Sequence, residues 1–243
     1  MLLFALASVL GCERVPPTPR VVGTPTPLDP ATTGTIAGRV LFEGVPPPPR
    51  TIAMESDPTC AAAHPGGLVV RDVEGADGGL ADAFVYVASG LEDRVFAPPT
   101  APVVIDQRGC RYVPRVAAAQ VGQPIVFKSS DDTLHNVHGE PRANARWNFG
   151  LPGPSTERTM VLDAPEVMAT VRCDVHPWMR LELSVVPHPY FVVTGADGTF
   201  RLPNVPAGAY TLAALHPTLG RRELAVTVAA GATAMATIRF ASP

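Results

Sequence analysis

Proline and glycine interrupt almost every apolar run of this 243-residue chain, which contains 28 prolines and 21 glycines. Proline cannot continue a helix and both residues favour turns, so the pattern argues against long helices. Short runs with alternating apolar side chains recur instead, among them residues 35–42, 124–128 and 167–172. Short strands at this spacing, separated by turn signals, predict an all-β protein built from one or two β-sandwiches.

The composition gives no sign of a nucleic-acid partner. The formal charge is −3, 46% of the residues are apolar, and no basic cluster is present. These values are typical of a folded domain and exclude a strongly basic binding surface. The length allows one large or two small domains.

The first residues have the form of an export signal. An apolar run at positions 2–10 is too short to span a bilayer but fits the core of a signal peptide. It ends in "VLGC", which resembles the lipobox of bacterial lipoproteins, although no Lys or Arg precedes it. The resemblance implies a signal over residues 1–12, lipid on Cys12 and a membrane-anchored protein on the periplasmic side of the cell envelope. The alternative is a plain secretory signal, an incidental Cys12 and a secreted product.

Three segments outside the central region can be separated. Residues 13–33 are rich in Pro and Thr and predict an extended linker. Residues 188–243 contain "ADGTFRLPNVPAGAYTL", with a hairpin turn at Asp197-Gly198. This stretch resembles the carboxypeptidase regulatory-like module, a small transthyretin-type β-sandwich without catalytic residues. Residues 34–94 hold strands of the type that opens this module, so we expect them to complete the same sandwich. The alternative is that they extend the sheets of the central region.

The central region, residues 95–187, holds a concentration of metal donors. "CDVHPWM" places Cys173, His176 and Met179 within seven residues, and His135 precedes them on a loop after a predicted strand. A thiolate, two imidazoles and a weak thioether can serve both Cu(I) and Cu(II). Zinc is the competing metal, but structural zinc sites use Cys, His and carboxylate ligands rather than Met.

The order of these donors resembles the ligand layout of cupredoxins, and "LHNVH" with "CDVHPWMR" is most similar to the amicyanin and plastocyanin type. The resemblance implies a Greek-key β-sandwich with one type 1 copper ion bound by His135, Cys173, His176 and Met179. It also implies that Asn136 ties the two ligand loops together by hydrogen bonds. Asp174 stands where relatives often have Ser or Thr, so its role is open.

Two further residues of the ligand loop have expected roles. Pro177 fixes the backbone and makes the loop compact. By resemblance, Trp178 and Pro177 form an apolar patch where electrons leave and a partner docks. The alternative for Trp178 is a buried anchor of the loop.

The remaining cysteines suggest one disulfide. If Cys12 carries lipid and Cys173 binds metal, Cys60 and Cys110 are left to pair, which export would permit. The neighbouring His64 allows a second metal site with Cys60 as the alternative.

These features predict an electron carrier rather than an enzyme. The expected partners are a cytochrome c, dehydrogenase or oxidase, and the membrane through the lipid anchor. A copper oxidase or nitrite reductase would need several more histidines, and the chain has six in all. The third class is a copper-trafficking or surface-interaction lipoprotein without an electron-transfer role.

Overall fold

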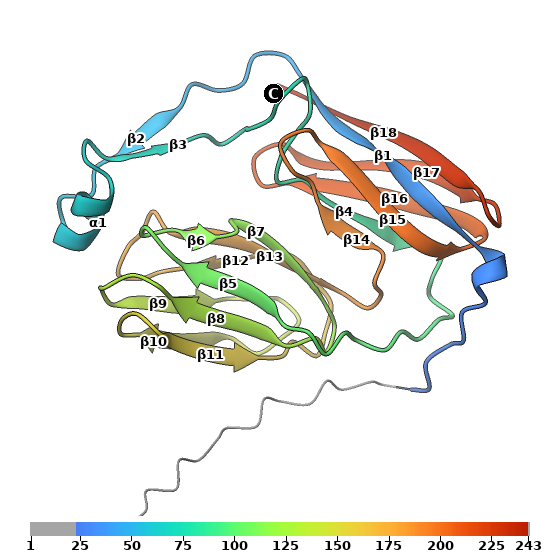
Figure 1. Cartoon of the computed structure of the whole chain (residues 1–243), viewed down its shortest axis with the longest axis horizontal. Helices are drawn as coiled ribbons and strands as arrows, with labels where there is room; N and C mark the ends of the chain where they lie inside the picture. Colours follow the sequence, from blue (N-terminus) through green and yellow to red (C-terminus); the bar gives the residue numbers. More distant parts are fainter. Residues whose placement is uncertain (1–22, 243) are drawn as a thin grey trace, which may run out of the picture.

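The computed structural model describes residues 23–242, which form two β-sandwiches (Figure 1). This confirms the all-β prediction. In the described residues the helical elements are two short ones, η1 (Pro30–Thr32) and α1 (Pro58–Ala63). No helix among these residues has the length and apolar character needed to cross a membrane.

The central sandwich consists of two sheets, with strand orders β10-β9-β12-β13-β7 and β11-β8-β5-β6. Its strands are β5 (Val103–Gln107), β6 (Tyr112–Val113), β7 (Val116–Gln120), β8 (Ile125–Ser129), β9 (His135–Gly139), β10 (Trp147–Leu151), β11 (Thr156–Met160), β12 (Glu166–Arg172) and β13 (Arg180–Val186). In β8, alternate side chains Ile125 and Phe127 are buried in the core, as expected for a strand with one face inward. The parallel pairs β5–β8 and β7–β13 show that the chain crosses between sheets rather than forming a simple meander.

The second sandwich is discontinuous in sequence, and we refer to it as the discontinuous sandwich. Its sheets have the orders β15-β1-β18 and β14-β4-β16-β17. The strands are β1 (Thr33–Glu43), β4 (Phe84–Ser89), β14 (Phe191–Val193), β15 (Thr199–Pro206), β16 (Gly208–His216), β17 (Gly220–Val228) and β18 (Thr233–Ala241). Strand β1 lies between β15, its antiparallel neighbour, and β18, its parallel neighbour. Two strands of the 34–94 segment, β1 and β4, therefore lie in the discontinuous sandwich.

Between β1 and β4 the chain makes an excursion to the central sandwich. This excursion, residues 50–70, contains β2 (Arg50–Ile52), α1 and β3 (Leu68–Val70), and we call it the cap. Figure 1 shows it reaching from the end of β1 across to one end of the central sandwich. Met54, Cys60 and Leu68 are buried in the core of the central sandwich. The 34–94 segment thus serves both sandwiches, an arrangement that neither sequence alternative foresaw.

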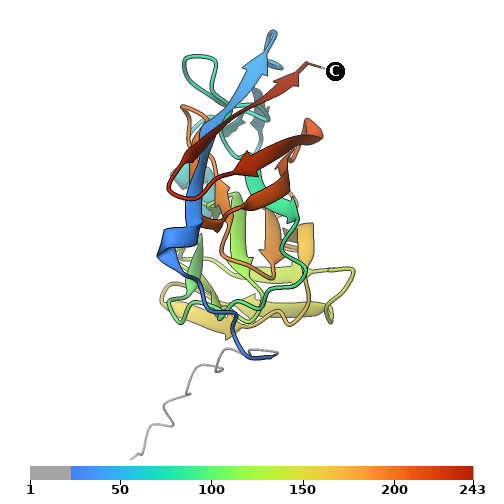
Figure 2. The ribbon, with the colours of Figure 1, turned by 90° about the vertical axis from the view of Figure 1, so that its right-hand side faces the viewer.

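The two sandwiches pack directly on each other, one above the other in the side view (Figure 2). Phe84, Tyr86 and Ala213 from one form a buried cluster with Val116 and Val186 from the other. The chain before β1 is also attached to the fold.

The structure describes the predicted linker 13–33 only from residue 23 onward, and this part contacts the fold. Thr26 N–H donates to the Val95 carbonyl at 2.8 Å, and Val95 N–H donates to the Thr26 hydroxyl at 3.0 Å. The element η1 follows, and β1 begins at Thr33. The earlier residues, including the predicted lipidation site Cys12, lie outside the described range.

Candidate metal centre

The predicted ligands lie at the ends of three adjacent strands of the central sandwich. His135 is the first residue of β9, Cys173 directly follows β12, and Met179 directly precedes β13. Strands β9, β12 and β13 are neighbours in one sheet. The loop between β12 and β13 is closed by Cys173 N–H donating to the Met179 carbonyl at 3.2 Å and Met179 N–H donating to the His176 carbonyl at 2.9 Å. The seven-residue spacing therefore produces one tight turn.

Three donor atoms converge in the interior. His135 Nδ1 lies 2.9 Å from His176 Nδ1, and Cys173 Sγ lies 3.8 Å from His176 Nδ1. All three atoms fall within 4.8 Å of one another. One ion with bonds of about 2.0 Å to nitrogen and about 2.3 Å to sulfur can bridge such distances. The side chains are 0%, 2% and 1% exposed for His135, His176 and Cys173, so water is excluded from the donors.

Met179, the fourth predicted ligand, ends the same loop. Its side chain is buried in the core cluster that also contains Cys173. A thioether there is a weak, soft donor in an apolar setting, which suits copper better than zinc. The donor set of the described residues therefore fits a copper ion.

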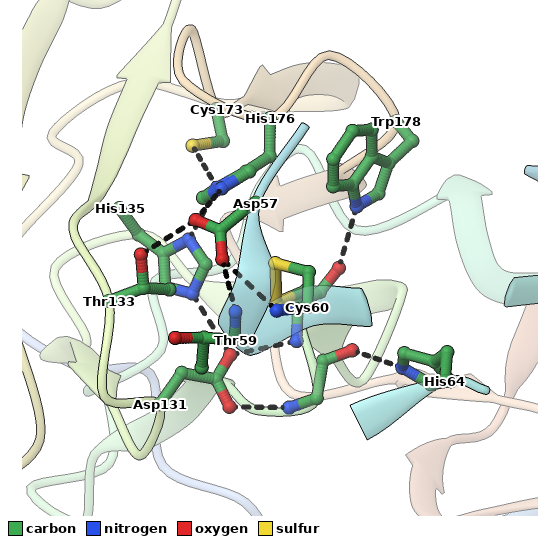
Figure 3. Close-up of a disulfide and its surroundings, with 12 residues drawn as sticks. Asp57, Thr59, Cys60, His64, Asp131, Thr133, His135, Cys173, His176 and Trp178 are labelled. Atoms are coloured by element: carbon green, nitrogen blue, oxygen red, sulfur yellow. Dashed lines mark hydrogen bonds and ion pairs between the residues drawn. A yellow bond between two sulfur atoms is a disulfide. The ribbon is translucent and has the colours of Figure 1, made fainter. Parts of the chain in front are cut away.

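The outer nitrogen of each histidine contacts a carboxylate (Figure 3). His135 Nε2 lies 2.9 Å from Asp131 Oδ2, and His176 Nε2 lies 2.9 Å from Asp57 Oδ2. A carboxylate that accepts a hydrogen bond from Nε2–H favours the tautomer whose Nδ1 lone pair is free for a metal. Two lone pairs facing each other at 2.9 Å need a shared cation between them, either a proton or a metal ion.

The charges of the metal-free site fit this arrangement. Burial opposes charge on His135, but its contacts with Asp131 and Cys173 together raise the pKa of the imidazole to about 9. Burial likewise opposes ionisation of Cys173, yet hydrogen bonds from His135 and from the Asn136 N–H lower the pKa of the thiol. The metal-free site therefore holds an imidazolium proton next to a thiol of lowered pKa, and metal binding at such a site releases protons.

Asn136 and Asp174 join the two ligand loops. Asn136 N–H donates to Cys173 Sγ at 3.4 Å, and the Asn136 side-chain oxygen accepts from the Asp174 N–H. The Asp174 carboxylate accepts from Asn136 Nδ2 at 3.0 Å and Asn148 Nδ2 at 2.9 Å, and contacts His138 Nδ1 at 2.8 Å. The hydrogen bond to His138, above all, lowers the pKa of Asp174 to about 2. Asp174 is thus the acceptor at the centre of a polar network over the loop, and His138 belongs to this network rather than to the donor cluster.

Trp178 lies against the ligand His176. The ring centroids are 5.1 Å apart, and the indole N–H donates to the Cys110 carbonyl at 3.1 Å. The side chain is half-buried and lines a cleft of about 660 Å³ between the two sandwiches, while Pro177 is exposed. The indole is thus anchored by its nitrogen and also reaches a hollow of the surface.

Cys60 of α1 and Cys110 form a disulfide across 50 residues. Two other donor groupings at the site include one of these cysteines, whose sulfur is therefore not a thiolate. His64 contacts the Gly109 carbonyl at 2.7 Å. Cys60 and His64 thus have structural partners, which argues against the second metal site considered from the sequence.

Asp57 and Asp131 were not identified from the sequence. Asp57 is 119 residues away from His176, and no local pattern links them. The "DPT" stretch was a usable signal for a helix start, with Asp as N-cap and Pro in the first turn, and α1 does begin there. That signal predicts that the Asp57 carboxylate caps the start of the helix, but it does not predict the contact with the His176 ring.

One family model matches the chain, that of the β-sandwich domain of ER membrane protein complex subunit 7, over residues 174–242. It covers less than half of the chain and does not assign the chain to that family. The match corrects the relation to the carboxypeptidase regulatory-like module expected for this segment. Both modules are β-sandwiches, so the "ADGTF" pattern indicated a sandwich without indicating its family.

Solved copper-protein structures overlap with parts of the chain. A copper-containing nitrite reductase from Thermus scotoductus SA-01 is 19% identical, with a TM-score of 0.33, over 41% of this chain and only 25% of that one. A purple cupredoxin from Nitrosopumilus maritimus is 18% identical, with a TM-score of 0.30, over 34% of this chain and 98% of that one. A Cu(I) form of an amicyanin variant is 17% identical, with a TM-score of 0.32, over 42% and 97%. No curated protein matches by sequence. These TM-scores are too low to support an assignment, so the metal centre rests on the contacts above.

Proposed function

We propose that the chain is a type 1 copper protein that carries single electrons. The observation that supports this most is the buried meeting of His135 Nδ1, His176 Nδ1 and the Cys173 sulfur, with both outer ring nitrogens held by carboxylates. Such a donor set in a pocket that excludes water serves a redox ion and leaves no open position for a substrate. We therefore propose a carrier rather than an enzyme.

Copper bound by His135, Cys173, His176 and Met179 would supply the one-electron change between Cu(II) and Cu(I). The protein residues contribute rigidity. The strand ends of β9, β12 and β13 fix the ligand loops, and Asn136 and Asp174 join them by hydrogen bonds. Because the donors are already in place, little rearrangement accompanies the change of charge.

For the location, we propose export to the cell envelope with a lipid anchor at Cys12, and exchange of electrons with a cytochrome c, dehydrogenase or oxidase there. The Cys60–Cys110 disulfide supports an oxidising compartment. Exposed apolar side chains next to ligands, Leu134 and Val175, offer contact surface for a protein partner.

A copper-trafficking role is the second candidate. It requires ready exchange of the metal, whereas the donors here are almost fully buried. The burial favours the electron carrier.

The test is to add Cu(II) to the purified, folded protein and record its absorption. An intense blue thiolate-to-copper band that bleaches reversibly with a mild reductant is expected. Cys173→Ser should abolish the band and Cys60→Ser should retain it. A folded protein that takes up Cu(II) without this band contradicts the type 1 assignment.

A further inference from the structure

The cap covers the metal centre at His176. We propose that Asp57 of the cap is a positioning residue for the copper ligand His176, and that the cap closes the outer edge of this ring and lowers the reduction potential of the centre. This inference rests on the proposed copper function. The cap follows β1 of the discontinuous sandwich in the chain, yet its buried side chains belong to the core of the central sandwich.

The Asp57 carboxylate is fixed at both oxygens. Oδ1 accepts the N–H groups of Thr59 at 2.8 Å and Cys60 at 3.1 Å and so caps the N-terminus of α1. Oδ2 lies 2.9 Å from His176 Nε2 and accepts the Thr133 hydroxyl at 2.8 Å. Two backbone N–H groups and a hydroxyl thus donate to this carboxylate, and hydrogen bonds of this kind favour its ionised form. A negative charge is thus held against the far side of a ligand ring (Figure 3).

Covalent and polar links hold the cap in this position. Cys60 of α1 is bonded to Cys110, and Cys110 N–H donates to Asp131 at 2.8 Å. Asp131 in turn contacts His135. The cap therefore connects the supports of both ligand histidines: Asp57 at one ring, and through the disulfide the loop that holds Asp131 at the other.

This arrangement has an electrostatic consequence. A carboxylate hydrogen-bonded to a ligand imidazole raises the basicity of the ligand. Negative charge near the metal also stabilises Cu(II) more than Cu(I), because the attraction grows with the charge of the ion. Asp57 should therefore lower the reduction potential.

It also has a steric consequence. His176 is 2% exposed, and the carboxylate occupies the position beyond Nε2. A reagent can reach the copper at this ring only if the cap moves. The disulfide that ties α1 to the central sandwich opposes this movement.

The test compares Asp57→Asn with Asp132→Asn in the copper-loaded full chain. Asp132 is exposed on the loop beside α1, and its backbone carbonyl accepts the Thr59 hydroxyl, so the control removes the same charge nearby without touching a ligand. Asp57→Asn should retain the blue band and shift the reduction potential to more positive values than both the parent and the control. Equal reduction potentials in the two variants would overturn the inference that Asp57 lowers the potential of the centre. If the parent itself shows no blue band, the proposed function fails, which is a separate outcome.

Metal retention tests the closure. Asp57→Ala should weaken Cu(II) binding about 10- to 100-fold, the usual effect of losing such a partner. The Cys60→Ser/Cys110→Ser variant should release copper faster to a bulky Cu(I) chelator. Parent-like release from a variant that circular dichroism shows to be folded would overturn the closure. If that variant does not fold, the release rate of Asp57→Ala against Asp132→Ala decides the same question.

Discussion

At the scale of single residues, Trp178 combines two contacts that can be separated by mutation. Trp178→Phe keeps an aromatic ring beside His176 but loses the donor to the Cys110 carbonyl. It should lower the free energy of unfolding by about 1 kcal/mol, the usual net value of one hydrogen bond. The copper spectrum should be unchanged. Urea unfolding and visible absorption measure the two effects.

Trp178→Ala also removes the ring that reaches the cleft beside the ligand. If the indole carries electrons to the surface, the self-exchange rate, measured by NMR line broadening, should fall in Trp178→Ala and remain close to the parent in Trp178→Phe. An unchanged rate in Trp178→Ala, with an intact spectrum, would leave Trp178 with only the anchoring role.

The residues that could be predicted from the sequence are those whose relation is local. Cys173, His176 and Met179 are read from a spacing of three residues each, because one loop fixes their positions. The partners Asp57 and Asp131 could not be read in this way. They meet the histidine rings through the packing of the cap and of a separate loop, and a single sequence carries no pattern for such contacts.

At the scale of elements, the cap depends on its disulfide. Closing a loop of 50 residues restricts the unfolded chain, and chain-entropy estimates give about 4 kcal/mol for such a loop, with measured values of about 2–4. Cys60→Ser/Cys110→Ser should lower the free energy of unfolding by this amount in the metal-free protein. Cys173→Ser, which breaks no disulfide, is the control. A similar loss of unfolding free energy in both variants would contradict the stabilising role of the disulfide.

Strand β1 requires a glycine at position 38, where it approaches its parallel neighbour β18. A Cβ atom added at Gly38 would lie 1.7 Å from the Ala236 carbonyl oxygen of the parallel strand β18. Gly38→Ala must therefore separate two paired strands, and we expect a loss of about 1–3 kcal/mol, as for overpacked cores. Thermal unfolding measures it. Gly153→Ala is the control, because nothing lies within 4 Å of its added Cβ; equal stability of the two variants would contradict the close approach.

At the scale of elements, the sequence predicted only part of the fold. The strand pattern predicted sandwiches correctly, since alternation and turn residues are local signals. It did not predict that residues 50–70 leave one sandwich for the other. That path is decided by where Met54 and Leu68 find apolar neighbours, and burial of this kind depends on the assembled core.

At the scale of the whole molecule, two buried histidines should make stability depend on pH. His188 and His216 are buried, and burial lowers the pKa of each to about 4. In the unfolded chain the same groups titrate near 6.5. Between these values the unfolded chain binds protons that the folded chain does not. The free energy of unfolding should therefore fall as pH decreases from 6.5 to 4, by on the order of 3 kcal/mol for each histidine.

Other titrating groups act mainly outside this window. Burial opposes ionisation of Asp131, but hydrogen bonds from His135 and backbone N–H groups together lower its pKa. Its contribution to stability is therefore lost mostly below the unfolded carboxyl value of about 4. The raised pKa of His135 contributes stability that is complete below 6.5 and is lost only toward pH 9. Urea unfolding of the metal-free protein at several pH values between 6.5 and 4 therefore isolates the buried pair. His188→Gln/His216→Gln should flatten the slope, even though lost contacts lower its stability at every pH. A slope as steep as that of the parent would show that other groups cause the acid sensitivity.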